Sequence, residues 1–468
     1  MLFSLDEILR ATGGALLGAP PEAVSAVSTD SRSVKPGELF VALRGPRFDG
    51  HDFIGEVARK GVQLTVADAS WLGAHEIPSG IAVISVPDTL HALGDLAAFH
   101  RSRFSIPLVG VTGSNGKTTT KEMLAAILAR TGKGLKTSGN LNNLIGLPQM
   151  LLQLTEKDRW AVLEMGMSEP GEIDRLAEIA APQVGIVTNA FPAHLESMGS
   201  VEAVAQAKGE LFLRLPAGGT AVCNADDPLI CGLTIADGVT RLAYGLHGAQ
   251  VTASGLENAG HAGQRFILQI AGAELPVNLR AFGRHNVLNA LAAAAAAFSL
   301  GIDASEIRCG LESFEPVEKR FRLEELGDVT LVDDSYNANP GSMAAALVTL
   351  SDIRGSGRAL AVLGDMLELG AGAMEAHHEV GRLAATCVCR LYLLGRFAET
   401  VKAGALEGGL PDENIVVAED HEQILADLRG SLQVGDTILV KGSRGSRMEK
   451  VSEGLRAWQS VVAGKGGI

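Results

Sequence analysis

Short apolar runs alternate with amphipathic stretches along most of the chain. Near the beginning, ELFVAL and GIAVISV have the length and residue types of strands, and VARKGVQLTVAD looks like the end of a helix followed by a buried strand. Towards the end, five more strand-like runs each finish in small, polar or charged residues: VTLVDDS, RALAVLGDM, RLYLLG, NIVVAED and DTILVKG. Strands that alternate with helices predict parallel sheets covered on both faces, so the expected fold class is α/β.

The middle of the chain continues the same alternation. A helical stretch from Thr89 to Arg103 precedes the apolar run of IPLVGVTGSNGKTTT, and further strand-like runs follow at WAVLEMG and VGIVTN. With 468 residues, the chain is long enough for about three domains of ~150 residues each. We place them at residues 1–85, 86–316 and 317–468. They would be a small α/β domain, a central domain with a mainly parallel sheet around a phosphate-binding loop (P-loop), and a Rossmann-like C-terminal domain.

The composition is that of a globular protein and excludes several classes of function. Hydrophobic residues make up 46% of the chain, and the formal net charge of -14 argues against a nucleic-acid-binding protein, which needs a basic face. The N-terminal MLFSLDEILRATGG is acidic where a signal peptide would be apolar. The longest apolar run, Ala290 to Phe298, is too short to span a bilayer and predicts a packed alanine-rich helix. We therefore expect a cytoplasmic protein that neither inserts into membranes nor binds nucleic acid.

The five cysteines are scattered and form no C-x-x-C pair. Such thiols are typical of reduced, mostly buried side chains in a large intracellular protein, and they do not predict a structural zinc site.

The strongest local signal is the segment from Gly110 to Thr119, where a strand runs into a glycine-rich turn and then into a helix. The backbone N–H groups of such a turn and the N-terminus of the helix bind a triphosphate. Lys117 can reach the β- and γ-phosphates, and the hydroxyl of Thr118 can coordinate Mg²⁺. The general pattern has a glycine where this chain has Val111, so the loop is a variant. A tight turn with a solvated lysine is the weaker interpretation, because strand, turn and helix occur in the right order.

Polar residues follow two of the predicted strands near this loop. Glu164 ends the strand of WAVLEMG, Asn189 and His194 follow the strand of VGIVTN, and Lys208 lies in the helical stretch VEAVAQAKGE. The carboxyl ends of parallel strands meet at one edge of a sheet, so these side chains could converge beside the loop and offer oxygen ligands to Mg²⁺. Taken singly, each is more typical of a solvated charge, a structural histidine or a surface lysine.

The chain resembles the Mur ligase family, most closely the members that add D-alanyl-D-alanine. The segments that carry this resemblance follow one another from about residue 110 to 447: TGSNGKTTTKE, SGNLNNLIGLP, LEMGMSEPGEI, PAHLESMGSVEAVAQAKGE, GRHNVLNALAA, DDSYNANPGSM, LGDMLELG and VKGSR. The N-terminal STDSRSVKPGELFVALRGPRFDGHDF also fits. The resemblance implies a three-domain ligase whose N-terminal domain binds a UDP-linked substrate, whose centre binds ATP and whose C-terminal domain binds the incoming amine.

The activity implied by the resemblance is ATP- and Mg²⁺-dependent ligation of D-alanyl-D-alanine to a UDP-N-acetylmuramoyl-tripeptide in peptidoglycan synthesis. The reaction would pass through an acyl phosphate, because an amine does not displace hydroxide from a carboxylate. The partners would be small-molecule substrates, and the protein would act as a monomer. Alternatives are another Mur ligase, a folylpolyglutamate synthetase or, from another class, an ATPase switch. The switch would need an aspartate at the strand end where this chain has Glu164.

The resemblance also assigns metal ligands. Thr118 and Glu164 would bind one Mg²⁺, and His194 would help to hold a second. Lys208 matches a lysine that is carbamylated in this family, and carbamylation turns a cation into an anionic oxygen ligand. The expected catalytic residues are Lys117, Lys208, His194 and Arg320.

Further roles concern the nucleotide and the substrate. Asn286 would contact adenine, Arg320 the terminal phosphate, and Asp334 the ribose with Tyr336 nearby. Two alternatives stay open: Asn286 could simply serve the start of a helix, and DDSYNANP is also a good turn sequence. The expected cofactor-binding residues are Gly113, Ser114, Asn115, Gly116, Lys117, Thr118, Thr119, Asn286, Arg320, Asp334 and Tyr336. The expected substrate-binding residues are Ser31, Arg32, Asn140 and Asn143, and His377 and His378 are expected at the surface.

Overall fold

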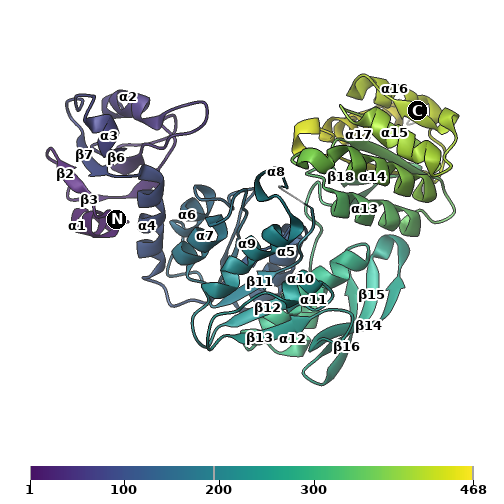
Figure 1. Ribbon diagram of the computed structural model, residues 1–468, viewed down its shortest axis with the longest axis horizontal. Coiled ribbons are helices and arrows are strands. Elements are labelled where there is room, and N and C mark those ends of the chain that lie inside the picture. The colour runs from purple at the N-terminus through teal and green to yellow at the C-terminus, as the bar shows by residue number, and fades with distance from the viewer. Residues whose placement is uncertain (1, 193–194, 466–468) are drawn as a thin grey trace. The chain divides into compact units, whose positions relative to one another are not determined.

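A computed structural model describes residues 2–192 and 195–465 of the protein (Figure 1). The chain forms two compact units. The first comprises Met1–Gly110, Lys133–Met167 and Glu172–Pro182, and the second comprises Val111–Gly132, Ser168–Gly171 and Gln183–Ile468. Within the described residues, no helix is both long and apolar enough to cross a bilayer.

The first unit contains a five-stranded sheet in the order β2-β7-β6-β5-β4, parallel except for β2. Its strands coincide with the predicted runs ELFVAL, VQLTVAD and GIAVISV, which confirms these predictions. One face packs on α1 and α4 through Ile8, Leu93 and Leu96, and the other on α2 through Ile54 and Val57. The elements are β1 (Phe3–Ser4), α1 (Leu5–Thr12), β2 (Ala15–Leu17), β3 (Ala23–Val24), β4 (Ala26–Ser28), β5 (Glu38–Val41), α2 (Ile54–Arg59), β6 (Leu64–Asp68), α3 (Ala69–Leu72), β7 (Ala82–Val86) and α4 (Thr89–Arg101).

The same unit continues after residue 133. The two short strands β9 and β10 pair in parallel, and α6 and α7 both pack against α4. Thr137 is buried, and its hydroxyl accepts a 2.8 Å hydrogen bond from the backbone N–H of Glu164 at the end of β10. The bounds are β9 (Leu135–Lys136), α6 (Gly146–Leu151), β10 (Ala161–Glu164) and α7 (Glu172–Ala180).

The second unit begins where β8 (Leu108–Thr112) leads into α5 (Lys117–Leu128). Strands β11, β12, β13 and β14 pair in parallel, and β15 and β16 then extend the sheet through antiparallel pairs (Figure 1). The sequence analysis did not predict this antiparallel part. Further elements are β11 (Val184–Val187), α8 (Leu195–Met198), α9 (Val201–Leu213), β12 (Thr220–Asn224), α10 (Pro228–Cys231), β13 (Thr240–Tyr244), β14 (Val251–Asn258), β15 (Gln264–Ile270), β16 (Ala273–Leu279), α11 (Arg284–Ser299) and α12 (Ala304–Glu312).

Helix α11 confirms the prediction of a packed alanine-rich helix. Every residue from Ala290 to Ala297 is fully buried, and the helix packs on α5 and α12 and on strands β11 to β15. A helix with apolar residues all round has to be enclosed by other elements, and alanine lets them come close.

The C-terminal part of this unit is a six-stranded sheet in the order β17-β18-β22-β19-β20-β21, parallel except for β17. All five predicted strands are present, and the α/β prediction is confirmed. The elements are β17 (Arg322–Leu326), β18 (Val329–Asp334), α13 (Pro340–Ile353), β19 (Ala359–Gly364), α14 (Ala373–Cys387), β20 (Arg390–Leu394), α15 (Ala398–Glu407), β21 (Ile415–Val417), α16 (His421–Ser431), β22 (Thr437–Lys441) and α17 (Glu449–Lys465).

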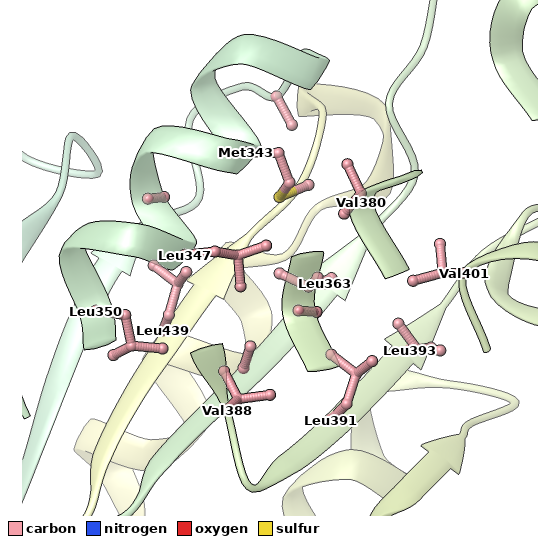
Figure 2. Packing of buried hydrophobic residues seen from close by; sticks show 14 of the residues in the cluster. Met343, Leu347, Leu350, Leu363, Val380, Val388, Leu391, Leu393, Val401 and Leu439 are labelled. Atoms are coloured by element: carbon pink, nitrogen blue, oxygen red, sulfur yellow. The ribbon is translucent and has the colours of Figure 1, made fainter. Parts of the chain in front are cut away.

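Alternating side chains along each C-terminal strand enter two separate cores. On one face, Leu347 of α13 and Val380 of α14 pack on Leu439 and its neighbours in the sheet (Figure 2). On the other face, Leu425 of α16 and Leu455 of α17 pack on the intervening residues of the same strands. The helices therefore cover both faces of the sheet, as in a doubly wound fold.

Two predictions about single residue types were wrong. His377 is buried rather than at the surface, because its Nε2 accepts a 2.9 Å hydrogen bond from the Met366 N–H and its ring stacks on Phe397. His378, one residue further round the helix, is half-buried. The cysteines are free thiols, but only Cys223 of the five is buried, since the others lie towards the ends or outer faces of their elements.

Candidate active site

The phosphate loop joins the end of β8 to the start of α5, as predicted. Gly113 and Gly116 have φ values of +147° and +84°, a region that favours glycine. A Cβ on Gly113 would overlap the Thr188 hydroxyl, and one on Gly116 would overlap the Asn289 side chain. Val111, which replaces the glycine of the general pattern, is a fully buried core residue of β8. Position 111 is therefore occupied by a core residue instead of a glycine. The loop keeps glycine at 113 and 116, where neighbouring side chains leave no room for a Cβ.

The loop is anchored to the end of β11. The backbone N–H of Ser114 donates to the Asn189 carbonyl at 3.0 Å, and the N–H of Asn115 donates to Asn189 Oδ1 at 2.9 Å. The hydroxyl of Thr188 donates to the Asn115 carbonyl at 2.6 Å. Sequence reasoning placed Asn189 after a strand but gave it no role. Its position between strand and loop was the available signal.

The helix start carries the predicted lysine. Helix α5 begins at Lys117, and its N-cap Gly116 makes no side-chain capping bond. The Lys117 ammonium donates to the carbonyls of Gly113 at 2.5 Å and Ser114 at 3.4 Å, so it folds over its own loop. Backbone N–H groups at a helix N-terminus together with an ammonium form an anion-binding arrangement. This geometry suits a polyphosphate.

Lys208 lies on α9 with only 2% of its surface exposed. Burial lowers the pKa of its amine well below the usual value, and the positive charge of Lys117 lowers it further. Within residues 2–192 and 195–465, no ion pair or hydrogen bond joins this amine to another residue. Burial beside the positive charge of Lys117 therefore favours the neutral form of this amine.

The other two predicted metal ligands are Glu164 and His194. Glu164 is buried at the end of β10 in the first unit. His194 lies outside the described residues. Among the residues that the structure does describe, no group of three or more His, Cys, Asp and Glu side chains could hold a metal ion. The roles of Glu164 and His194 stay predictions.

A pocket in the second unit brings together three predicted nucleotide-binding residues, Thr119, Asn286 and Arg320. Apolar residues complete its wall: Ala281, Phe282, Phe314, Pro316, Val317 and Phe321. Gly283, not Asn286, is the N-cap of α11, and Asn286 Nδ2 donates to the Phe282 carbonyl at 2.8 Å. An amide and a guanidinium beside three phenylalanine rings can contact a planar heterocycle by hydrogen bonding and stacking.

The segment after β18 holds the remaining predicted residues. Asp334 accepts 2.7 Å and 3.1 Å hydrogen bonds from Lys441 Nζ and the Phe321 N–H. The Arg320 guanidinium lies 3.8 Å from the centre of the Tyr336 ring and donates to the Thr118 hydroxyl at 3.4 Å. Asp334 and Arg320 are thus fixed in orientation. Lys441 was missed from the sequence, because nothing local distinguishes it from other strand-end lysines.

The turn interpretation of DDSYNANP is also correct in part. Asn339 is the N-cap of α13, its side chain accepts from the Ser342 N–H, and Pro340 occupies the first turn. The same Asn339 side chain exchanges two hydrogen bonds with Asn115 of the phosphate loop, at 3.1 Å and 2.8 Å. This pair joins positions 224 residues apart in the chain.

We expect the pair to act as a unit in catalysis. Asn115→Ala and Asn339→Ser should each lower kcat/KM by roughly 3- to 10-fold, the value of one or two hydrogen bonds, and the double variant should lose no more than either. Serine keeps a cap for α13, so melting temperatures should stay near that of the wild type. Ser342→Ala is the control, since it disturbs the cap but not the pair. Fully additive losses would contradict the coupling.

His285 at the start of α11 gives a pH prediction. Burial lowers the pKa of its imidazole to about 4, with the Asp334 carboxylate opposing and the Lys441 ammonium assisting. In the unfolded chain the imidazole of His285 is protonated with a pKa of ~6.5. The free energy of unfolding should therefore decrease as the pH falls from about 6.5 towards 4. We expect His285→Asn to reduce the loss of unfolding free energy between about pH 7.5 and pH 5 in denaturant titrations. The exposed His247→Asn should change it little, and an unaltered loss in His285→Asn would contradict the assignment.

The predicted substrate residues lie in the first unit. Arg32 is exposed and paired with Asp30 at 2.7 Å, and this guanidinium lowers the pKa of Asp30 to about 2. The Ser31 carbonyl accepts from Lys60. Asn143 Oδ1 accepts from the Gly146 N–H at 2.8 Å and so supports the start of α6, while Asn140 is exposed. Their substrate roles stay predictions.

Comparison with known proteins adds to this geometry. Three family models match successive parts of the chain: the Mur ligase family catalytic domain at residues 23–101, the Mur ligase middle domain at 111–297, and the Mur ligase glutamate ligase domain at 319–444. A curated relative from Escherichia coli (strain K12), a UDP-N-acetylmuramoyl-tripeptide--D-alanyl-D-alanine ligase, is 37% identical over 458 residues, covering 97% of this chain and 98% of the relative. The chain belongs to the Mur ligase family.

Other Mur ligases support the same assignment. A relative of the same name from Synechocystis is 39% identical over 90% of this chain and 89% of its own length. A crystal structure of MurF from Acinetobacter baumannii has a TM-score of 0.90 at 32% identity, covering 97% of this chain and 99% of that one. MurF from Thermotoga maritima in complex with ADP has a TM-score of 0.83 at 30% identity, covering 93% and 98%. The three-domain Mur ligase architecture is confirmed, while the domain boundaries proposed from the sequence stay predictions.

Proposed function

We propose that this protein joins D-alanyl-D-alanine to a UDP-N-acetylmuramoyl-tripeptide at the expense of ATP, forming the pentapeptide precursor of peptidoglycan. The observation that carries the proposal is the phosphate loop, where α5 begins at Lys117, Arg320 donates a hydrogen bond to Thr118, and the charge of Lys117 acts on the buried amine of Lys208. Curated relatives with this activity in their names match nearly the whole chain. The substrates would be small molecules, and the reaction would need no membrane insertion.

The chemistry begins at the terminal carboxylate of the tripeptide. Its oxygen attacks the γ-phosphorus of ATP, and the bond between this phosphorus and the β,γ-bridging oxygen breaks. The products are an acyl phosphate and ADP. The protein contributes position and charge: the loop amides and Lys117 hold the phosphates, and Arg320 offsets charge on the transferring group. The amine of D-alanyl-D-alanine then attacks the acyl carbon, loses a proton, and expels phosphate to leave an amide.

Magnesium would supply additional positive charge between the phosphates when bound. A carbamylated Lys208 would add an anionic ligand for such an ion, since the described residues contain no cluster of three or more His, Cys, Asp and Glu side chains that could hold it by themselves. Addition of CO₂ to the neutral amine of Lys208, with loss of one proton, gives a carbamate. Its anionic oxygens are the hard ligands that Mg²⁺ prefers. The hydroxyl of Thr118 would be a further ligand, and Glu164 and His194 remain expected ones.

Phosphate release with a panel of amines tests the proposed function. Purified protein with ATP, Mg²⁺ and the UDP-linked tripeptide should release phosphate with D-alanyl-D-alanine. It should not do so with D-glutamate, L-alanine, meso-diaminopimelate or L-glutamate, and mass spectrometry should show the pentapeptide product. Turnover with one of those amino acids instead would indicate another Mur ligase or a folylpolyglutamate synthetase-like enzyme. Fast ATP hydrolysis without the UDP-linked substrate would favour an ATPase switch.

A further inference from the structure

The loop between β22 and α17 contains a cation that the proposed reaction has not used. We infer that Arg444, in this loop, binds the C-terminal carboxylate of the incoming dipeptide. The inference rests on the proposed function and identifies how the amine substrate would be held.

The location of Arg444 is the crevice of a doubly wound sheet. Strand β22 lies between β18 and β19, and Lys441 at its end is in register with Asp334 of β18 and Leu363 of β19. The chain leaves β18 and β19 towards α13 and α14 on one face, but leaves β22 towards α17 on the other. Neighbouring connections that diverge in this way open a ligand crevice at the carboxyl edge. Arg444 lies on the connection that leaves β22.

The residue before Arg444 is held firmly in this crevice. The Ser443 hydroxyl donates to the Ala338 carbonyl at 3.1 Å and accepts from the Leu367 N–H at 2.9 Å. The Ser443 N–H donates to the Asp365 carbonyl at 2.9 Å. Three hydrogen bonds therefore tie the loop to the segments that follow both neighbouring strands. A preorganised backbone lowers the cost of holding a ligand at the next residue.

The guanidinium of Arg444 is available, whereas two other cations of the second unit are engaged. Lys441 pairs with Asp334, and Arg320 lies over Tyr336. Arg444 is exposed, and no ion pair or side-chain hydrogen bond joins its guanidinium to any residue of 2–192 or 195–465. A planar guanidinium matches a carboxylate with two parallel hydrogen bonds. The dipeptide carries such a carboxylate at the end opposite its amine.

A chain of contacts connects this loop to the phosphate loop. Ala338, which Ser443 contacts, precedes Asn339, and Asn339 pairs with Asn115 of the phosphate loop. An extended dipeptide spans at most ~7 Å, so under the proposal its amine would lie within that distance of the carboxylate bound to Arg444. Leu367 is 46% exposed and lies so near Gly445 that a Cβ there would be 2.8 Å from its Cδ1. It offers an apolar surface beside Arg444 for an alanine methyl group.

The test compares D-alanyl-D-alanine with its C-terminal carboxamide, D-alanyl-D-alaninamide, in wild type and variants. Wild type should use the carboxamide with a KM roughly 10- to 100-fold higher, the range of a charge-assisted pair. Arg444→Ala should raise KM for the dipeptide by a similar factor, abolish the preference between the two amines, and leave KM for ATP within about twofold. Arg444→Lys should restore part of the preference. Arg447→Ala is the matched control, because Arg447 is also exposed and lies three residues further along the loop.

Each other outcome overturns the inference. It fails if wild type does not distinguish the two amines, if Arg444→Ala keeps the wild-type ratio of KM values, or if Arg447→Ala loses that ratio instead. Calorimetric binding of the two amines to each variant gives the same comparison should turnover be too slow to measure, and melting temperatures verify folding. Failure of the proposed function can be told apart from failure of this inference. In that case the wild type itself would form no pentapeptide from D-alanyl-D-alanine.

Discussion

Replacing Lys117 with alanine is expected to reduce amide formation by roughly 10³-fold or more while the protein stays folded. The ammonium lies over the loop that starts α5, where its charge would offset that of the transferring phosphate. It contributes little to packing, since Gly113 and Gly116 set the loop conformation and Val111 fills the core. Initial rates of phosphate release measure the effect. A melting temperature close to that of the wild type would exclude unfolding as its cause.

The exposed Lys157 provides the control for this variant, because Lys157→Ala removes the same charge far along the sequence from the loop. It should keep wild-type rates. Near-normal turnover of Lys117→Ala would show that the loop does not handle the phosphate that is transferred. Nucleotide affinity should also fall, which separates this variant from those that affect only the amine substrate.

The second large effect is expected at Lys208. Lys208→Ala should be inactive, because the carbamate ligand is lost, and a short carboxylate such as acetate should restore part of the activity by entering the space left by the side chain. Acetamide, with the same shape and no charge, should not restore it. Labelled bicarbonate should give a carbamate signal in the wild type by ¹³C NMR. Full activity of Lys208→Ala would refute the carbamate.

Lys117 would favour the proposed carbamate in two ways. Its positive charge lowers the pKa of Lys208, so more of the amine is neutral and can react with CO₂. The same charge then attracts the anion that forms. The carbamate signal should therefore be weaker in Lys117→Ala than in the wild type, at equal bicarbonate concentration. An unchanged signal would mean that burial alone controls the reactivity of Lys208.

Much of the site depends on contacts that pair distant residues. Asn189 and Asn339 both form hydrogen bonds with Asn115 of the loop, from 74 and 224 residues away in the sequence. Arg320 donates to Thr118 at the start of α5, 202 residues away. Each of these residues is ordinary in its own local sequence. A strand-end asparagine, a helix N-cap and a basic residue after a proline-containing turn occur in many proteins, so sequence periodicity gives them no special role.

The sequence by itself determined the strands and the loop, because both depend on local physics. A run of four to six apolar residues between polar ends forms a buried parallel strand, and glycine at 113 and 116 permits the backbone angles of the turn. The identity of the metal-binding candidates came from a resemblance and not from spacing. Only the tertiary structure decided which side chains are buried, as for Lys208 and His377, and which charges are engaged, as for Lys441. Burial and ion pairing depend on residues that folding brings together from distant parts of the chain. A single stretch of sequence therefore does not predict them.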